Sequence, residues 1–270
     1  MRVRRIGFLL SRRWLVFLVV VIALAWLAWR LGEWQFDRLA DRKERNAIIE
    51  RNEALPPAPV TEVLAVGDEV GADEQWRVVE ATGTYDVDDT VVVRYRSRDG
   101  ASGVDLVVPL VLDDGTSLLV DRGWVAADAD STPDELPQPP AGEVTITAWV
   151  RQDGTGGSTT VTDHSTRAIS SERIGEALDR PVLGGFADLR SESPEPETPL
   201  RQAELPELDN GPHFFYGLQW WFFGLLAVFG FFYLVYDEWR GVRRPSRRHG
   251  SHADDPPEPA ADLEHDAHQG

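Results

Sequence analysis

The sequence of 270 residues contains no cysteine, and its single methionine is the first residue. Without cysteine the chain can form no disulfide, no zinc–thiolate site and no covalent haem attachment through a C-x-x-C-H motif. Without an internal methionine it offers no thioether ligand to copper or to haem iron. A bound metal or cofactor would therefore be held by histidine, carboxylate, aromatic or backbone groups.

Lysine is almost absent as well. Lys43 stands against 26 arginines, and the whole chain carries a net charge of −18. The negative charge is concentrated in residues 37–212, where 36 acidic residues face 16 basic ones, a difference of −20. Such a region repels nucleic acid and anionic lipid head groups, so no nucleic-acid partner is expected.

Motifs for enzymatic chemistry are missing too. The chain has no G-x-S-x-G elbow, no phosphate-binding glycine loop and no H-E-x-x-H pair. His164, in T-D-H-S, is the candidate base of the acidic region, and it fits a loop better than an active site. The sequence therefore favours a non-enzymatic role.

Two long apolar segments flank the acidic region. The first covers residues 14–31, broken only by Arg30, and the second covers residues 213–236. From Phe214 to Tyr236 no residue is charged, and these 23 residues at about 1.5 Å each form a helix of about 35 Å. That length crosses a hydrocarbon layer of about 30 Å. Both segments are predicted to be transmembrane helices in contact with the lipid bilayer.

The distribution of arginine predicts the orientation of these helices. Residues 1–13 contain five arginines, and five more follow the second segment between residues 240 and 248. Basic flanks are typical of the cytoplasmic side, so both termini, including a disordered tail at 237–270, are expected in the cytoplasm. The protein is then a two-span protein of the plasma membrane. The alternative is a signal peptide cleaved after the small-x-small pattern Ala23-Leu24-Ala25.

Between the two segments the pattern changes from helical to β. Residues 32–55 are rich in helix formers and are expected to extend the first helix up to Pro56. Residues 56–190 contain β-branched runs separated by turn signals, typical of an antiparallel sheet or barrel. Residues 191–212, with five prolines, fit an extended strap. The predicted strands are 76–85, 90–96, 104–112, 117–125, 143–151 and 182–189, with a short helix at 170–178. The predicted fold class is a membrane α+β protein, with two transmembrane helices flanking a β-rich extracytoplasmic domain.

Polar residues mark a candidate site at the start of the second apolar segment. Four of them follow a spacing of i, i+3, i+6 and i+7 and therefore share one helix face. In a two-span hairpin, the outer end of the first helix lies at the same depth. Neutral imidazole is the strong axial haem ligand that remains in this chain, although histidine at this depth is also a common interfacial group. The residues are His213, Tyr216, Gln219 and Trp220 on the second helix and Trp34 and Gln35 on the first.

Three segments, in order, resemble the Surfeit locus protein 1 family. They are L-G-E-W-Q-F-D-R after the first apolar segment, V-P-L-V-L-D-D-G-T-S-L-L-V-D-R-G-W-V in the β region and G-P-H-F-F-Y-G-L-Q-W-W at the second. Their spacing follows the family over nearly the whole chain apart from the last 30 residues. The resemblance implies assembly of haem-copper cytochrome c oxidase by binding haem a and presenting it to the catalytic subunit, with haem a synthase as a further partner.

The resemblance also implies roles for individual residues. His213 would be the axial ligand of the haem iron, and Arg38 and Arg122 would bind the haem propionates, since a guanidinium can bind a carboxylate with two bonds. A basic position of the family falls on Arg42 or on Lys43. The family's motifs correspond to Trp34-Gln35-x-x-Arg38, Arg122-Gly123-Trp124 and His213-x-x-Tyr216-x-x-Gln219-Trp220.

Gly123 stands between two large residues at the end of a predicted strand. A glycine in this place predicts a bulge or a close backbone approach that a Cβ would obstruct, so Gly123 and Trp124 are expected to be structural.

Two other functions stay open at this point. The protein could be a membrane-anchored scaffold that contacts oxidase subunits without holding haem. It could also be an extracytoplasmic sensor domain.

Overall fold

The computed structural model describes residues 7–127 and 136–241. The chain divides into two compact units. One contains Trp34–Phe215, and the other contains the described residues of 1–33 and 216–270.

Two helices are long and apolar enough to cross a membrane, α1 (Arg12–Ala54) and α3 (His213–Gly241). A short 3-10 turn, η2 (Gly7–Leu10), precedes α1. In their most apolar windows only 17% and 6% of the residues are buried. Leaving this much apolar surface in water is unfavourable by about 25 cal/mol per Å², a cost that a hydrocarbon layer would remove. α1 continues without a break through the predicted extension and ends just before Pro56.

Aromatic and small residues pack the two helices together within the unit that contains their apolar parts. Trp29 stacks on Trp221 with ring centroids 5.6 Å apart, and Phe17 lies 5.6 Å from Phe231. Gly32 faces the Trp221 indole, which occupies the space that a Cβ would need. The glycine therefore lets the Trp221 side chain pack directly against the backbone of α1.

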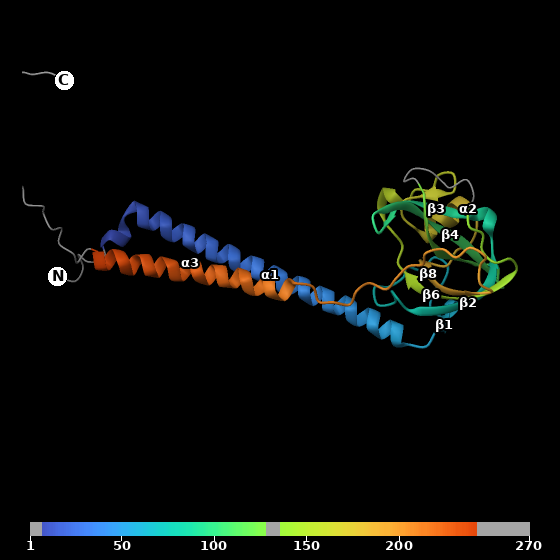
Figure 1. The fold of residues 1–270 in the computed structure, drawn as a ribbon, viewed down its shortest axis with the longest axis horizontal. Helices are drawn as coiled ribbons and strands as arrows, with labels where there is room; N and C mark the ends of the chain where they lie inside the picture. Colours follow the sequence, from blue (N-terminus) through green and yellow to red (C-terminus); the bar gives the residue numbers. More distant parts are fainter. Residues whose placement is uncertain (1–6, 128–135, 242–270) are drawn as a thin grey trace, which may run out of the picture. The chain divides into compact units, whose positions relative to one another are not determined.

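The β domain is a barrel-like sheet with strand order β1-β2-β6-β8-β5-β4-β3-β7. An additional pairing of β2 with β4 closes strands β2, β6, β8, β5 and β4 into a ring (Figure 1). Most pairings are antiparallel, and β5 pairs with β8 in parallel. The strands are β1 (Ala58–Pro59), β2 (Val78–Tyr85), β3 (Val91–Arg98), β4 (Ala101–Leu112), β5 (Ser117–Ala126), β6 (Glu143–Arg151), β7 (Ser165–Thr166) and β8 (Phe186–Ser193).

Three apolar clusters stabilise this domain, and the smallest contains Val92, Val104 and Leu106. The largest cluster contains Leu110, Leu118 and Ile146, and alternate residues of the ring strands form most of it. A second cluster gathers under the helix α2 (Ser171–Leu178), where Ile174 is fully buried and lies with Leu119. Short 3-10 turns connect the strands: η3 (Val60–Glu62), η4 (Val87–Asp89) and η5 (Gly156–Thr159).

The predicted strands at 76–85, 90–96, 104–112, 117–125 and 143–151 are confirmed with shifts of up to three residues at their ends. The helix at 170–178 is confirmed too, and its cap Ser170 accepts a hydrogen bond from the Arg173 backbone N–H. β1 and β7 were not predicted, because two residues are too few for a pattern.

The prediction of a strand at 182–189 was partly wrong. Gly184 and Gly185, the latter with φ of +75°, turn the chain, so β8 starts only at Phe186. The strap predicted from residue 191 starts later for a related reason. Residues 191–193 still pair with Thr145–Thr147 of β6, so the ladder continues to Ser193.

Candidate functional site

His213 begins α3 and contacts α1 within the unit Trp34–Phe215. Its Nδ1 atom lies 2.8 Å from Oε1 of Gln35, a residue that is only 9% exposed. Because an amide oxygen only accepts, the imidazole donates through Nδ1–H, and Nε2 keeps a free lone pair. The structure thus brings together two of the predicted site residues.

Gln35 belongs to a set of residues that recur at helical spacing and share one face of α1, which we call the strap face. Its members are three, four or seven positions apart and therefore lie one above another. Gln35, Leu39 and Ile49 are buried, while Arg42 and Asn46 are half-buried and hold the strap.

The strap is held at Asp209, four residues before His213. Arg42 Nε donates to the Asp209 backbone carbonyl at 2.7 Å, and Asn46 Nδ2 donates to the same oxygen at 3.0 Å. The Arg42 guanidinium also pairs with the Asp209 carboxylate. These contacts fix the chain immediately ahead of α3.

Gly211 lies beside the free nitrogen of His213. Its φ of +61° is a left-handed conformation that favours glycine. A Cβ at this position would lie 3.5 Å from Nε2 of His213 and 3.6 Å from Nη1 of Arg42. A nitrogen with a lone pair and a cation nearby are groups that fit the iron and the acidic substituents of a porphyrin.

The remaining predicted site residues are close in sequence to either Gln35 or His213, apart from Arg122. Trp34 is half exposed, and the Arg38 guanidinium lies over its ring, 5.8 Å from the centroid. Tyr216, Gln219 and Trp220 follow His213 in α3 and belong to the other compact unit.

Arg122 lies elsewhere, in the interior of the β domain, and is only 1% exposed. Its Nη2 lies 2.9 Å from Oε1 of Glu192, its Nη1 donates to the Pro137 carbonyl at 3.3 Å, and its guanidinium lies over the Tyr85 ring. A buried charge persists only when it is paired in this way. This position gives Arg122 a structural role and does not support the expected contact with a propionate.

Gly123 occupies the bulge and the close approach that its neighbours predicted. Leu106 pairs with Gly123 and Val107 with Asp121, so Arg122 is an extra residue in β5. Gly123 has a φ of +130°, and a Cβ would lie 2.6 Å from the Arg201 carbonyl oxygen. The glycine therefore lets the strap reach the barrel.

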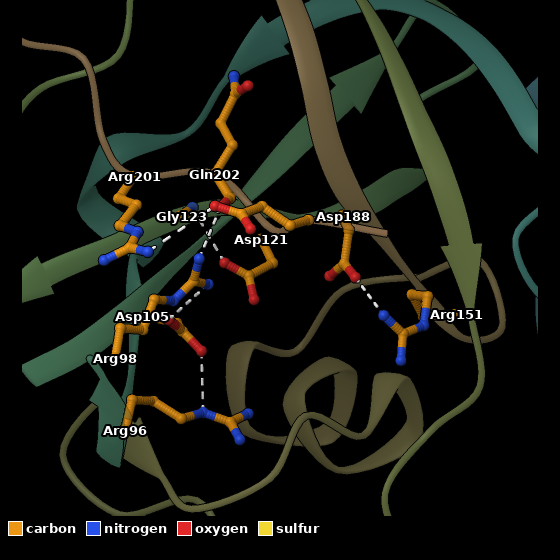
Figure 2. Close-up of polar contacts among 10 residues, drawn as sticks. Arg96, Arg98, Asp105, Asp121, Gly123, Arg151, Asp188, Arg201 and Gln202 are labelled. Atoms are coloured by element: carbon orange, nitrogen blue, oxygen red, sulfur yellow. Dashed lines mark hydrogen bonds and ion pairs between the residues drawn. The ribbon is translucent and has the colours of Figure 1, made fainter. Parts of the chain in front are cut away.

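A buried cluster of charges, which the sequence did not predict, surrounds this bulge. Figure 2 shows Asp121 of β5 between Asp105 of β4 and Asp188 of β8. Asp105 pairs with Arg96 at 2.9 Å, and Asp188 pairs with Arg151. Each aspartate stands within one of the predicted strands, and an acidic residue in such an apolar run is the signal that could have found them.

Asp121 is the least compensated member of this cluster. It is 7% exposed and accepts the Gly123 backbone N–H at 3.0 Å, with no ion pair to any residue that the structure describes. Burial, and then the charges of Asp105 and Asp188, raise its pKa well above the ordinary value. Within the described ranges, no three His, Cys, Asp or Glu side chains group in a way that would hold a metal ion.

The molecule is thus a barrel-like β domain with two helices long and apolar enough to span a membrane, and His213 begins the second of these helices. Comparison with known proteins identifies the family: the SURF1 family model matches residues 22–225. The chain belongs to the SURF1 family, which confirms the resemblance found in its motifs.

Individual relatives agree with this assignment. Uncharacterized SURF1-like proteins of Mycobacterium tuberculosis and Mycobacterium bovis are 33% identical over 246 residues, which is 89% of this chain and 90% of each relative. Cytochrome oxidase assembly protein SHY1 of Saccharomyces cerevisiae is 26% identical over 114 residues, 42% of this chain and 29% of the yeast protein.

Proposed function

We propose that this protein is an assembly factor for haem-copper cytochrome c oxidase that binds haem a through His213 and delivers it to the catalytic subunit. Membership of the SURF1 family and the similarity to a yeast protein named for cytochrome oxidase assembly support the assembly role. The observation that carries the haem-binding part is the His213 ring, which Gln35 holds at Nδ1 so that Nε2, beside Gly211, keeps its lone pair.

Different residues of this chain would bind the haem iron, the acidic substituents and the face of the haem ring. When bound, the haem supplies an iron that accepts a nitrogen lone pair, and His213 Nε2 is the donor. Arg42, whose Nη1 lies beside Gly211, and Arg38, one turn earlier on α1, would supply cations suited to the acidic substituents of the haem. Trp34 adds an exposed aromatic face. A single neutral ligand releases its cargo more readily than a thiolate would, which suits a carrier.

We also place α1 and α3 across the plasma membrane, with both termini in the cytoplasm and the β domain outside. The exposed apolar side chains of both helices and the arginines beyond them support this topology. In this topology His213 lies at the outer end of its span. A reporter that is active only in the cytoplasm should give signal when fused after Gly270.

The test is the absorption spectrum of the full-length protein, purified in detergent from cells that produce haem a. The parent protein and His164→Ala, whose histidine lies in an exposed loop of the β domain, should carry haem. His213→Ala should remain in the membrane and lose the haem absorption. If the parent carries no haem and binds none in a titration, the scaffold function replaces this proposal. If His213→Ala binds as the parent does, another residue is the ligand.

A further inference from the structure

We infer that Gln35 is the positioning residue of this site: it selects the His213 tautomer in which Nε2, and not Nδ1, is free to bind a metal. The inference rests on the proposed function, because it deepens the chemistry of the same histidine. The tautomer of His213 in the haem-free protein can be measured separately from haem binding.

The hydrogen bond between these residues is well placed to select a tautomer. The Nδ1–Oε1 distance of 2.8 Å is that of an ordinary strong N–H···O bond. Gln35 is 9% exposed, so water competes poorly for its amide oxygen. A neutral imidazole carries one proton, and an acceptor at Nδ1 keeps the proton on that nitrogen. The lone pair is therefore left at Nε2.

Contacts on both sides of His213 help to hold the ring at this acceptor. Behind it in the chain, Arg42 and Asn46 hold Asp209. Ahead of it, the Phe214 ring meets Phe36 edge to face, with centroids 6.1 Å apart. Because Phe36 follows Gln35 and Phe214 follows His213, the aromatic pair fixes the register of the two polar residues.

The arrangement has a chemical consequence for a metal at Nε2. A histidine ligand that donates its other N–H to an acceptor is oriented and made more basic, and loss of such an acceptor typically lowers metal affinity about 10–100-fold. The Gly211 backbone faces Nε2, where a side chain would restrict access. Gln35 and Gly211 together direct the ligand to one nitrogen and one side of the ring.

The first experiment measures the tautomer in the haem-free protein. Histidine ring ¹⁵N chemical shifts would be recorded on full-length protein labelled at histidine, with the His213 signals assigned by their loss in His213→Ala. The parent and Gln35→Glu, whose carboxylate can only accept, should show His213 protonated at Nδ1. Gln35→Leu should populate both tautomers. Gln202→Leu is the matched control, because Gln202 contacts its neighbours through its backbone carbonyl.

The second experiment is a titration of the same proteins with haem in detergent. Gln35→Leu should bind about 10–100-fold more weakly than the parent, while Gln35→Glu and Gln202→Leu keep tight binding. An unchanged tautomer and unchanged affinity in Gln35→Leu would overturn the inference. If the parent takes up no haem, the proposed function fails, and the tautomer measurement still decides whether Gln35 selects the free nitrogen.

Discussion

Arg201 in the strap and Trp124 in β5 exchange two backbone hydrogen bonds, N–H to O=C, at 2.8 and 3.1 Å. The strap is thus bound to the barrel at one point and, through Asp209, to the strap face of α1 at another. His213 follows directly after the second point. This arrangement links the Arg-Gly-Trp motif of the β domain to the candidate haem ligand through one short stretch of chain.

Gly123→Val should weaken the first of these attachments. The new Cβ would meet the Arg201 carbonyl oxygen, and valine disfavours a φ of +130°. We expect a loss of about 1–3 kcal/mol of stability in thermal unfolding and faster proteolysis of the strap. Gly100→Val is the control, since Gly100 also has a positive φ but nothing lies within 4 Å of its Cβ position. Equal losses in the two variants would exclude the strap contact as the cause.

Arg122→Met should destabilise the β domain by about 3–5 kcal/mol, because it leaves the buried Glu192 carboxylate unpaired. The double variant Arg122→Met/Glu192→Leu should recover most of this loss in denaturant unfolding. Haem bound per folded molecule should stay at the parent level in the double variant. A well-folded double variant that no longer binds haem would instead restore Arg122 as a ligand-binding residue.

Asp121→Asn should remove part of the pH dependence of stability. The raised pKa of Asp121 means that the folded protein keeps this proton to a higher pH than the unfolded chain does. Stability is therefore lost as pH rises from the unfolded pKa, about 3.9, towards the folded value. Denaturant unfolding between pH 4 and pH 8 should show a steeper decline for the parent than for Asp121→Asn. Parallel curves would show that the buried carboxyl group contributes nothing.

Arg42→Ala should separate positioning from stability. The Arg42–Asp209 pair is largely exposed, so its loss should cost less than about 1 kcal/mol. The chain before His213 would be less well held, and haem affinity should fall several-fold. Arg45→Ala, an exposed neighbour on the same helix, is the control. Haem affinity equal to the parent's in Arg42→Ala would mean that the second attachment point does not position His213.

Much of the fold could be predicted from the sequence, because apolar length and β-branched alternation report local structure directly. Strands β2 to β6 of the β domain and both long helices follow from such patterns. The place of Arg122 could not be predicted, since the bulge at this residue changes which side of the strand it faces. The clustering of Asp105, Asp121 and Asp188 depends on the order of strands in the sheet, which local patterns do not contain.

The candidate site could be predicted only in part. A hairpin of two apolar helices places Gln35 and His213 at a similar depth, and the sequence predicted that much. The hydrogen bond between side chains 178 positions apart depends on helix rotation and on the path of the strap. Neither is visible in residue spacing.

The central claim is that His213 supplies the nitrogen that binds haem iron, and restoring that nitrogen tests it most directly. Haem a would be titrated into detergent-purified parent, His213→Ala and His213→Ala with free imidazole added, and the absorption spectra compared. We expect a parent spectrum that is lost in His213→Ala and returns with imidazole, which enters the space left by the side chain. Full haem binding by His213→Ala without imidazole, or no binding by the parent, would contradict it.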